Sequence, residues 1–149
     1  MKEILDKIIS YIKESFDADK EISVSVSIVE AYSQKKQSAP EITVQISNDS
    51  EVTRYTSFEG ENISQLAVQV TSYTQQIEIG GELKSAQEAA NIFSEKVRDL
   101  FQKPKIFTYI PEIVGVRRVG RTFATPQIKG AKVYMSPIRF EIQVINERR

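Results

Sequence analysis

The stretch Ser85–Gln102, SAQEAANIFSEKVRDLFQ, has a start, a period and an end that can all be read. Ser85 and Glu88 match a capping box, in which the hydroxyl and the carboxylate satisfy free N–H groups at a helix start. Lys103-Pro104 ends the pattern, because the residue before a proline is driven out of the helical conformation. The spacing predicts an apolar face made of Ala86, Ala90, Phe93, Val97, Leu100 and Phe101. It predicts a solvent face made of Glu88, Ser94, Glu95, Arg98 and Asp99. Small residues near its start suit a helix that lies closely on a sheet.

The residues before this helix predict one more helix and a series of strands. Lys2–Phe16 repeats apolar residues at helical spacing. Alternation of apolar and polar residues then predicts half-buried strands at Glu21–Glu30, Ile42–Ile46, Val52–Phe58 and Asn62–Tyr73. Ala31–Pro40 has no period and is longer than a tight hairpin requires.

The segments around the central helix are harder to assign. Ile77 and Ile79 either extend the strand before them or form a short strand of their own. We expect Gly80-Gly81 to turn the chain into the helix. After the helix, Ile106–Ile110 fits either a strand or an extended linker. Ile113–Phe123 and Ala131–Ile145 then predict a closing hairpin.

Together these elements predict a single α+β domain over residues 1–149. We expect a mostly antiparallel sheet with both helices packed on one face and a C-terminal β-hairpin that closes the fold. At 149 residues and 40% hydrophobic content, the chain has enough apolar material for one core.

The composition excludes most kinds of catalytic site. The chain has no cysteine and no histidine, which excludes disulfides, thiol nucleophiles, imidazole bases and metal sites built from those ligands. The acids Asp17, Asp19 and Glu21 lack the spacing of a calcium-binding loop, and Gly80-Gly81 lacks the lysine of a phosphate-binding loop. We therefore predict no catalytic, metal-binding or cofactor-binding residues, and a protein that is not an enzyme.

The sequence also bears on where the protein resides. No apolar run approaches the roughly 20 residues needed to cross a bilayer. Acids are interspersed along the N-terminal segment, which is unlike a signal peptide. We expect no membrane association and a product that stays in the cytoplasm where it is made.

The net charge is zero, but acidic and basic residues are unevenly distributed along the chain. Residues 1–100 hold ten Lys or Arg against seventeen Asp or Glu, whereas residues 101–149 hold ten against three. Opposite charges can pair within one molecule, which is the simpler interpretation. They can also form an acidic face that docks on the basic face of a neighbouring copy, as a head-to-tail ring or stack requires.

The densest basic feature lies in the predicted closing hairpin. It consists of Arg117, Arg118, Arg121, Lys129 and Lys132. Strand alternation predicts that Arg117 and Arg121 share one face and that Arg118 lies on the other. A solvated hairpin, a protein interface and a contact with passing nucleic acid all fit this cluster. The nearby aromatics lack the spacing of an RNA-binding motif, so sequence-specific recognition is not expected.

The order of elements resembles that of the tail terminator, or tail completion, proteins of tailed bacteriophages. The resemblance is carried by the N-terminal helix before a series of strands, by the helix SAQEAANIFSEKVRDLF, and by the ending RRVGRTFATPQIKGAKVYMSPIRFEIQV. It covers most of the chain and is a pattern of elements rather than of catalytic residues.

The resemblance implies a non-enzymatic virion protein in the neck region of the tail. Such a protein forms a ring, commonly a hexamer, that ends polymerisation of the tail tube and joins it to head-completion or connector proteins. It implies that DNA passes through the lumen without being read. Arg117, Arg118, Arg121, Lys129 and Lys132 would then lie at a subunit or tube contact, and Lys35 and Lys36 at an axial contact. A small-ligand or lipid-binding α+β domain, with a helix closing a curved sheet over a cavity, is the alternative.

Overall fold

The computed structural model describes residues 2–22, 26–30, 40–48, 55–56, 62–121, 125–126 and 133–146. Its helices are α1 (Lys2–Ala18), α2 (Ala86–Gln102) and α3 (Lys105–Tyr109). Its strands are β1 (Ser27–Glu30), β2 (Glu41–Asn48), β3 (Tyr55–Thr56), β4 (Asn62–Thr74), β5 (Ile77–Ile79), β6 (Glu82–Lys84), β7 (Ile113–Arg121), β8 (Thr125–Pro126) and β9 (Tyr134–Asn146).

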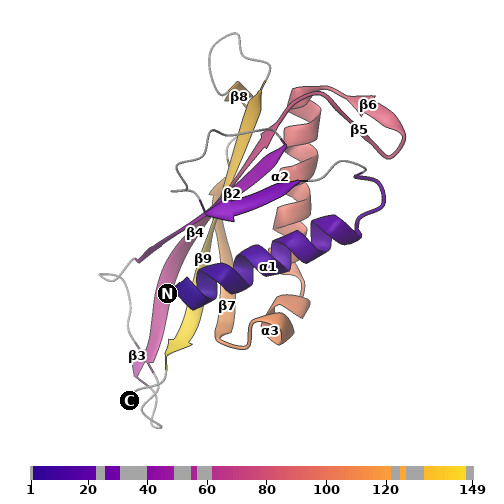
Figure 1. Ribbon diagram of the computed structural model, residues 1–149. Coiled ribbons are helices and arrows are strands. Elements are labelled where there is room, and N and C mark those ends of the chain that lie inside the picture. The colour runs from indigo at the N-terminus through magenta and orange to yellow at the C-terminus, as the bar shows by residue number, and fades with distance from the viewer. Residues whose placement is uncertain are drawn as a thin grey trace.

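The main sheet has the order β1-β2-β4-β9-β7, with β3 added beside β4 and β8 beside β9 (Figure 1). All of its pairs are antiparallel except β1 with β2, which run parallel. Two parallel strands need a connection that returns the chain to the end of the sheet where the first strand began. The predicted loop Ala31–Pro40 falls between these two strands, and its residues 31–39 lie outside the described part of the chain.

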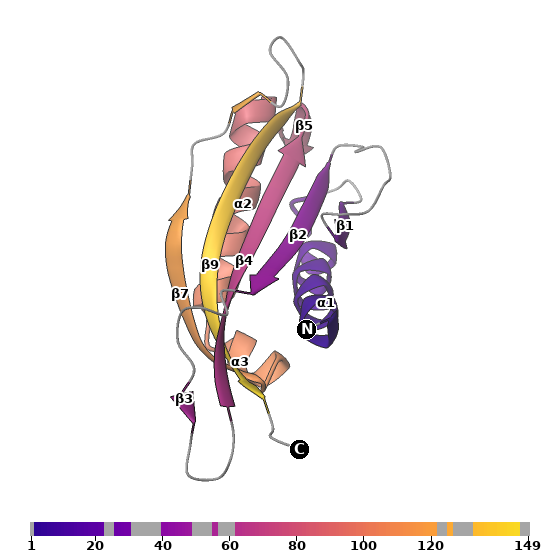
Figure 2. The same ribbon diagram turned by 90° about the vertical axis from the view of Figure 1, so that its left-hand side faces the viewer.

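Helices α1 and α2 cover one face of the sheet, as the sequence predicted. Figure 2 looks onto the opposite face, with α2 behind β4 and β9 and α1 beside β1 and β2. The two helices also contact each other, because the Phe16 and Phe93 rings meet edge to face with centroids 5.2 Å apart. Phe101 stacks on Phe140 of the sheet at 4.3 Å. The fold is therefore α+β, with one continuous core between the helices and the sheet.

Helix α2 begins and ends where its sequence predicts. Ser85 Oγ accepts a hydrogen bond of 3.2 Å from the backbone N–H of Glu88, which is the hydroxyl half of the capping box. Lys103 is the C-cap, and its N–H donates to the Asp99 carbonyl. The prediction was wrong for Ser94, which is fully buried and donates a 2.6 Å hydrogen bond to Ser136 Oγ of β9. A small hydroxyl can face a sheet when a polar partner lies opposite it.

Two segments differ from the sequence predictions. Gly80 and Gly81 do not lead into the helix but form the two-residue turn between β5 and β6, and both have positive φ. Positive φ at both turn positions matches the twist of a hairpin. The other segment, predicted as a strand or linker, is helix α3, which Pro104 starts as the N-cap. Five residues are too few to show a helical period, and burial of Ile106 secures this turn.

Candidate functional site

The face of the sheet that the helices leave open is mostly polar. Along the central strands the outward positions alternate with the buried apolar ones. They include Gln45 on β2, Gln65 and Gln69 on β4, and Arg139, Glu141 and Gln143 on β9. Cross-strand pairs join them into rows, such as Gln69 with Arg139 and Gln65 with Gln143. A broad, hydrated face of this kind can contact a partner or water without exposing the core.

Arg117 lies on this open face at the edge strand β7. It is paired in register with Glu141, and the Glu141 carboxylate accepts a 2.6 Å hydrogen bond from the Gln65 side chain. These side chains line a shallow cavity of about 200 Å³ with Gly115 and Gln143. A side chain at Gly115 would meet Gln143 Oε1 at 2.6 Å, so the glycine keeps this cavity open. Arg117 is exposed and available to a partner.

The other predicted basic residues have different outcomes. Arg118 and Arg121 lie within β7, in register with Phe140 and Ile138, both of which face the helices. The register of β7 against β9 shifts between Arg118 and Gly120. The structure does not describe the side chains of Arg118 and Arg121, so the prediction that Arg117 and Arg121 share a face stays a prediction. Lys35, Lys36, Lys129 and Lys132 lie outside the described residues.

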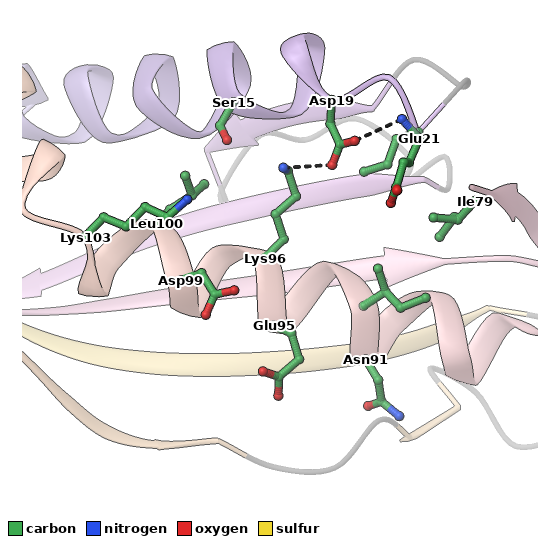
Figure 3. A pocket seen from close by; sticks show the side chains of 12 residues that line it. Ser15, Asp19, Glu21, Ile79, Asn91, Glu95, Lys96, Asp99, Leu100 and Lys103 are labelled. Atoms are coloured by element: carbon green, nitrogen blue, oxygen red, sulfur yellow. Dashed lines mark hydrogen bonds and ion pairs between the residues drawn. The ribbon is translucent and has the colours of Figure 1, made fainter.

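A second hollow lies between α1, α2 and the β5–β6 hairpin (Figure 3). Its volume is about 400 Å³, and its lining includes the apolar side chains of Ile22, Ile79, Ile92 and Leu100. Lys96 reaches across from α2 and contacts the Asp19 carboxylate at the end of α1 at 2.9 Å. The Glu21 backbone N–H donates to the same carboxylate at 3.0 Å. The hydrogen bond from Lys96 is the main cause that lowers the pKa of Asp19 below its ordinary value.

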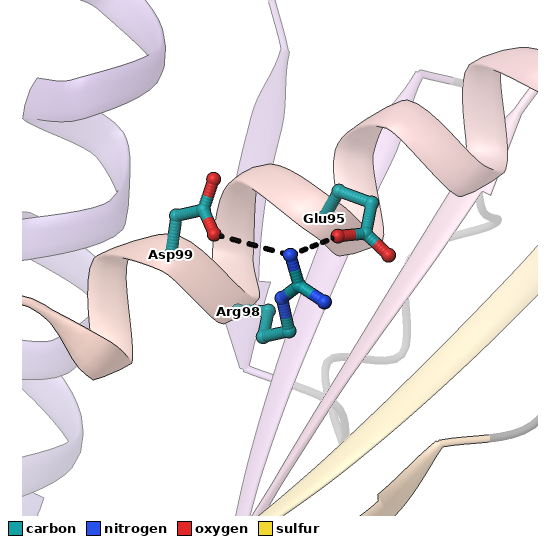
Figure 4. A network of polar contacts seen from close by, with 3 residues as sticks. All are labelled: Glu95, Arg98 and Asp99. Carbon is teal, nitrogen blue, oxygen red and sulfur yellow. Dashed lines mark hydrogen bonds and ion pairs between the residues drawn. The ribbon is translucent and has the colours of Figure 1, made fainter.

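Arg98 lies beside this groove on the surface of α2 (Figure 4). Its guanidinium contacts the carboxylates of Glu95, one turn earlier, and of Asp99. Pairs at this helical spacing are usually worth a few tenths of a kcal/mol when exposed. Asp19, Glu95 and Asp99 in the lining of this hollow are thus each paired with a cation of the same molecule.

Neither site has the features of a metal centre or a membrane segment. Among the described residues there is no group of three or more Asp and Glu placed to hold a metal ion. Within the same residues, no helix combines the length and apolarity that a membrane crossing needs.

A scan against protein-family models finds no match, and a search of the curated proteins finds none either.

Sequence reasoning missed the groove and the hairpin beside it. The groove depends on the approach of α1 to α2, which no local pattern encodes. The hairpin did leave a signal, because Gly-Gly between two short alternating segments is typical of a two-residue β-turn. The same two glycines were instead assigned to a strand-to-helix connection.

Proposed function

We propose that this chain is a structural subunit of a tailed bacteriophage, forming a ring that ends the tail tube at its head-proximal end. The observation that carries the proposal is the separation of charge between an acidic first hundred residues and a basic last third, with Arg117 exposed on an edge strand. A ring subunit meets its two neighbours through different patches, and opposite charges on those patches favour the correct contact. The resemblance of the element order to tail terminator proteins supports the same function.

The proposal assigns a part to each basic region. Arg117, Arg118 and Arg121 contact the neighbouring subunit or the tube protein, and the segment with Lys35 and Lys36 makes an axial contact. The head-completion or connector protein binds the other end of the ring. DNA passes through the lumen without being read, which requires only a hydrated surface and no base-reading side chains.

The alternative, a small-ligand or lipid-binding domain, is less well supported. It needs a cavity between the central helix and the sheet. At that position Phe101 stacks on Phe140, and Ala89 and Ala90 bring the helix close to the strands. The described hollows lie at the surface and are lined largely by charged or amide side chains.

Native mass spectrometry and negative-stain imaging of the purified chain test the ring directly. We expect a closed oligomer, commonly of six subunits. A chain that remains monomeric at high concentration and does not bind a tail tube protein would contradict the proposal.

Charge reversal tests which surface is used. We expect Arg117→Glu, Arg118→Glu and Arg121→Glu together to weaken assembly, and the loss to be larger at low salt, where charges are least screened. Lys13→Glu with Lys20→Glu is a control for charge reversal elsewhere on the surface, because both lysines are exposed on or just after α1. If the triple variant assembles like the control, the arginines are not at the contact.

A further inference from the structure

Another hollow adjoins the one between α1, α2 and the β5–β6 hairpin. It has a volume of about 370 Å³, and its lining includes residues of α1 and α2 together with Lys105 of α3. The two hollows have three lining residues in common, Ser15, Asp19 and Lys96. Figure 3 shows Lys96 reaching from α2 to Asp19, just after the end of α1. The ion pair between Lys96 and Asp19 therefore lies at the boundary where the two hollows meet.

Asp19 holds the chain as it turns out of α1. Its carboxylate contacts Lys96 Nζ at 2.9 Å and accepts a 3.0 Å hydrogen bond from the Glu21 backbone N–H. Its carbonyl accepts a 3.3 Å hydrogen bond from the Ile22 N–H. We call residues 19–22 the turn segment. A single side chain thus fixes the shape of this segment and also ties it to α2.

The turn segment continues into contact with the β5–β6 hairpin. Ile22 forms a β-bridge with Ile79, and the Gly80 N–H donates a 2.9 Å hydrogen bond to the Glu21 carbonyl. The hairpin is a two-stranded sheet of its own, and such a hairpin is marginal by itself. The hydrogen bond at Gly80 therefore depends on the position of the turn segment.

The ion pair is largely shielded from water. The side chains of Lys96 and Asp19 are 22% and 24% exposed, so salt screens their attraction less than it screens a surface pair. The Lys96 ammonium also lies over the Phe16 ring, 5.3 Å from its centroid. Lys96 is thus held across the hollows by one carboxylate and one aromatic face.

Charged side chains from every neighbouring element line the two hollows. They are Glu14 of α1, Glu21 of the turn segment, Glu95, Asp99 and Lys103 on or next to α2, and Lys105 of α3. Glu95 and Asp99 contact Arg98, and Tyr109 donates a hydrogen bond to Glu14. Three of these acids thus have other partners, and Glu21 is exposed. Loss of the Asp19 charge therefore removes the contact that holds Lys96 in place.

We propose that the Asp19–Lys96 pair is a latch that opens when Asp19 is protonated. While the carboxylate is ionised, the pair holds the turn segment against α2 and separates the two hollows. After protonation the turn segment moves away from α2, and the hollows become one trough whose lining includes Ile22, Ile92 and Leu100. The latch is a property of the single chain and does not depend on the proposed ring.

The direction of the pH response follows from the ion pair. The hydrogen bond from Lys96 is the main cause that lowers the pKa of Asp19 in the folded protein. A carboxyl with a lowered pKa stabilises the fold above its pKa in the unfolded chain. That contribution is lost as the pH falls through its pKa in the folded protein. The latch is therefore closed at neutral pH and opens in acid, below the ordinary Asp pKa of about 4.

Asp19→Asn tests the latch at neutral pH, because the amide has the shape of the protonated carboxyl and no charge. Hydrogen exchange followed by mass spectrometry reports on the turn segment through the N–H groups of Glu21, Ile22 and Gly80, which are hydrogen-bonded there. At pH 7 we expect these groups to exchange about tenfold faster than in the wild type, with unchanged exchange in the centres of β4 and β9. Asp17→Asn is the matched control, because Asp17 is exposed near the end of α1.

Lys96→Met tests the other half of the latch, because methionine keeps an unbranched side chain without the charge. We expect the same local increase in exchange, and Lys13→Met at an exposed position of α1 is the control. Since both substitutions break one contact, the double variant Asp19→Asn, Lys96→Met should exchange no faster than either single variant. Unchanged exchange in a single variant, additive increases, or faster exchange throughout the protein would each overturn the latch.

Acidification tests the protonation of Asp19 directly. Between pH 7 and pH 3, after correction for the intrinsic exchange rate, the turn segment of the wild type should become as open as that of Asp19→Asn. The variant itself should respond little, because its latch is already open. If both proteins respond to acid equally, Asp19 is not the group that opens the latch and the proposal fails.

Discussion

The two faces of strand β9 differ in burial, although their residues alternate along one segment of the chain. Ile138, Phe140 and Ile142 point toward the helices and are almost completely buried, whereas Arg139 and Gln143 point away and are exposed. Strand β4 buries Val68 and Val70 toward the helices in the same way, although Ala67 and Thr71 on its open face are also buried. Stability is thus concentrated on one face, and the other face is free to carry polar residues that serve contacts.

This separation predicts where substitutions harm the fold most. Phe140 is fully buried and stacks on Phe101, so Phe140→Ala removes a large side chain and leaves a cavity. We expect a loss of about 3–5 kcal/mol in the free energy of unfolding. Gln143→Ala on the exposed face of the same strand should change it by less than about 0.5 kcal/mol. Urea denaturation of both variants measures the difference, and similar losses would show that the open face also stabilises the fold.

The alternation that separates the faces is also what made much of the fold predictable. Strands β4 and β9 and helices α1 and α2 have long, regular patterns, and their class and position follow from the sequence. Helix α3 was missed because five residues carry no period. The parallel pairing of β1 with β2 was missed because alternation identifies a strand but not its partner.

The candidate sites were less predictable for the same physical reason. Arg117 was expected at a surface and is exposed there. The register of β7 shifts between Arg118 and Gly120, and an irregularity of this kind leaves little trace in composition. The groove at Lys96 and Asp19 joins residues 77 positions apart in the chain, a distance that only the tertiary fold reveals.

Glu41 is an acidic residue buried on the open face and allows a sharper test. It is only 5% exposed, its Oε2 atom has no hydrogen-bond partner among the residues that the structure describes, and burial raises the pKa of its carboxyl above the ordinary value. The folded state therefore favours the protonated form. The contribution of the Glu41 carboxyl to the free energy of unfolding is therefore complete below its pKa in the unfolded chain. That contribution is lost as the pH rises through its pKa in the folded protein.

We expect Glu41→Gln to stabilise the protein at pH 7 by roughly 1 kcal/mol, because the amide has a similar shape and never ionises. At pH 3 the wild-type carboxyl is already protonated, so the two proteins should have nearly the same stability there. Thermal unfolding across this range gives the difference between them. An equal gain at every pH, or a loss at pH 7, would mean that ionisation of Glu41 is not the cause.

Gly115 should give the smallest effect and tests whether the open face is adaptable. An added methyl would approach Gln143 Oε1 at 2.6 Å and Cδ at 3.3 Å, but Gln143 is exposed and its side chain can turn aside. Replacing glycine also reduces the freedom of the unfolded chain, which offsets the contact. We expect Gly115→Ala to change the free energy of unfolding by less than about 0.5 kcal/mol.

Gly81→Ala is the informative comparison, because no atom lies within 4 Å of its added methyl but its φ is +81°. That variant should lose about 1–2 kcal/mol from backbone strain alone. If Gly115→Ala costs as much, Gln143 is held rigidly and the open face is as tightly packed there as the core.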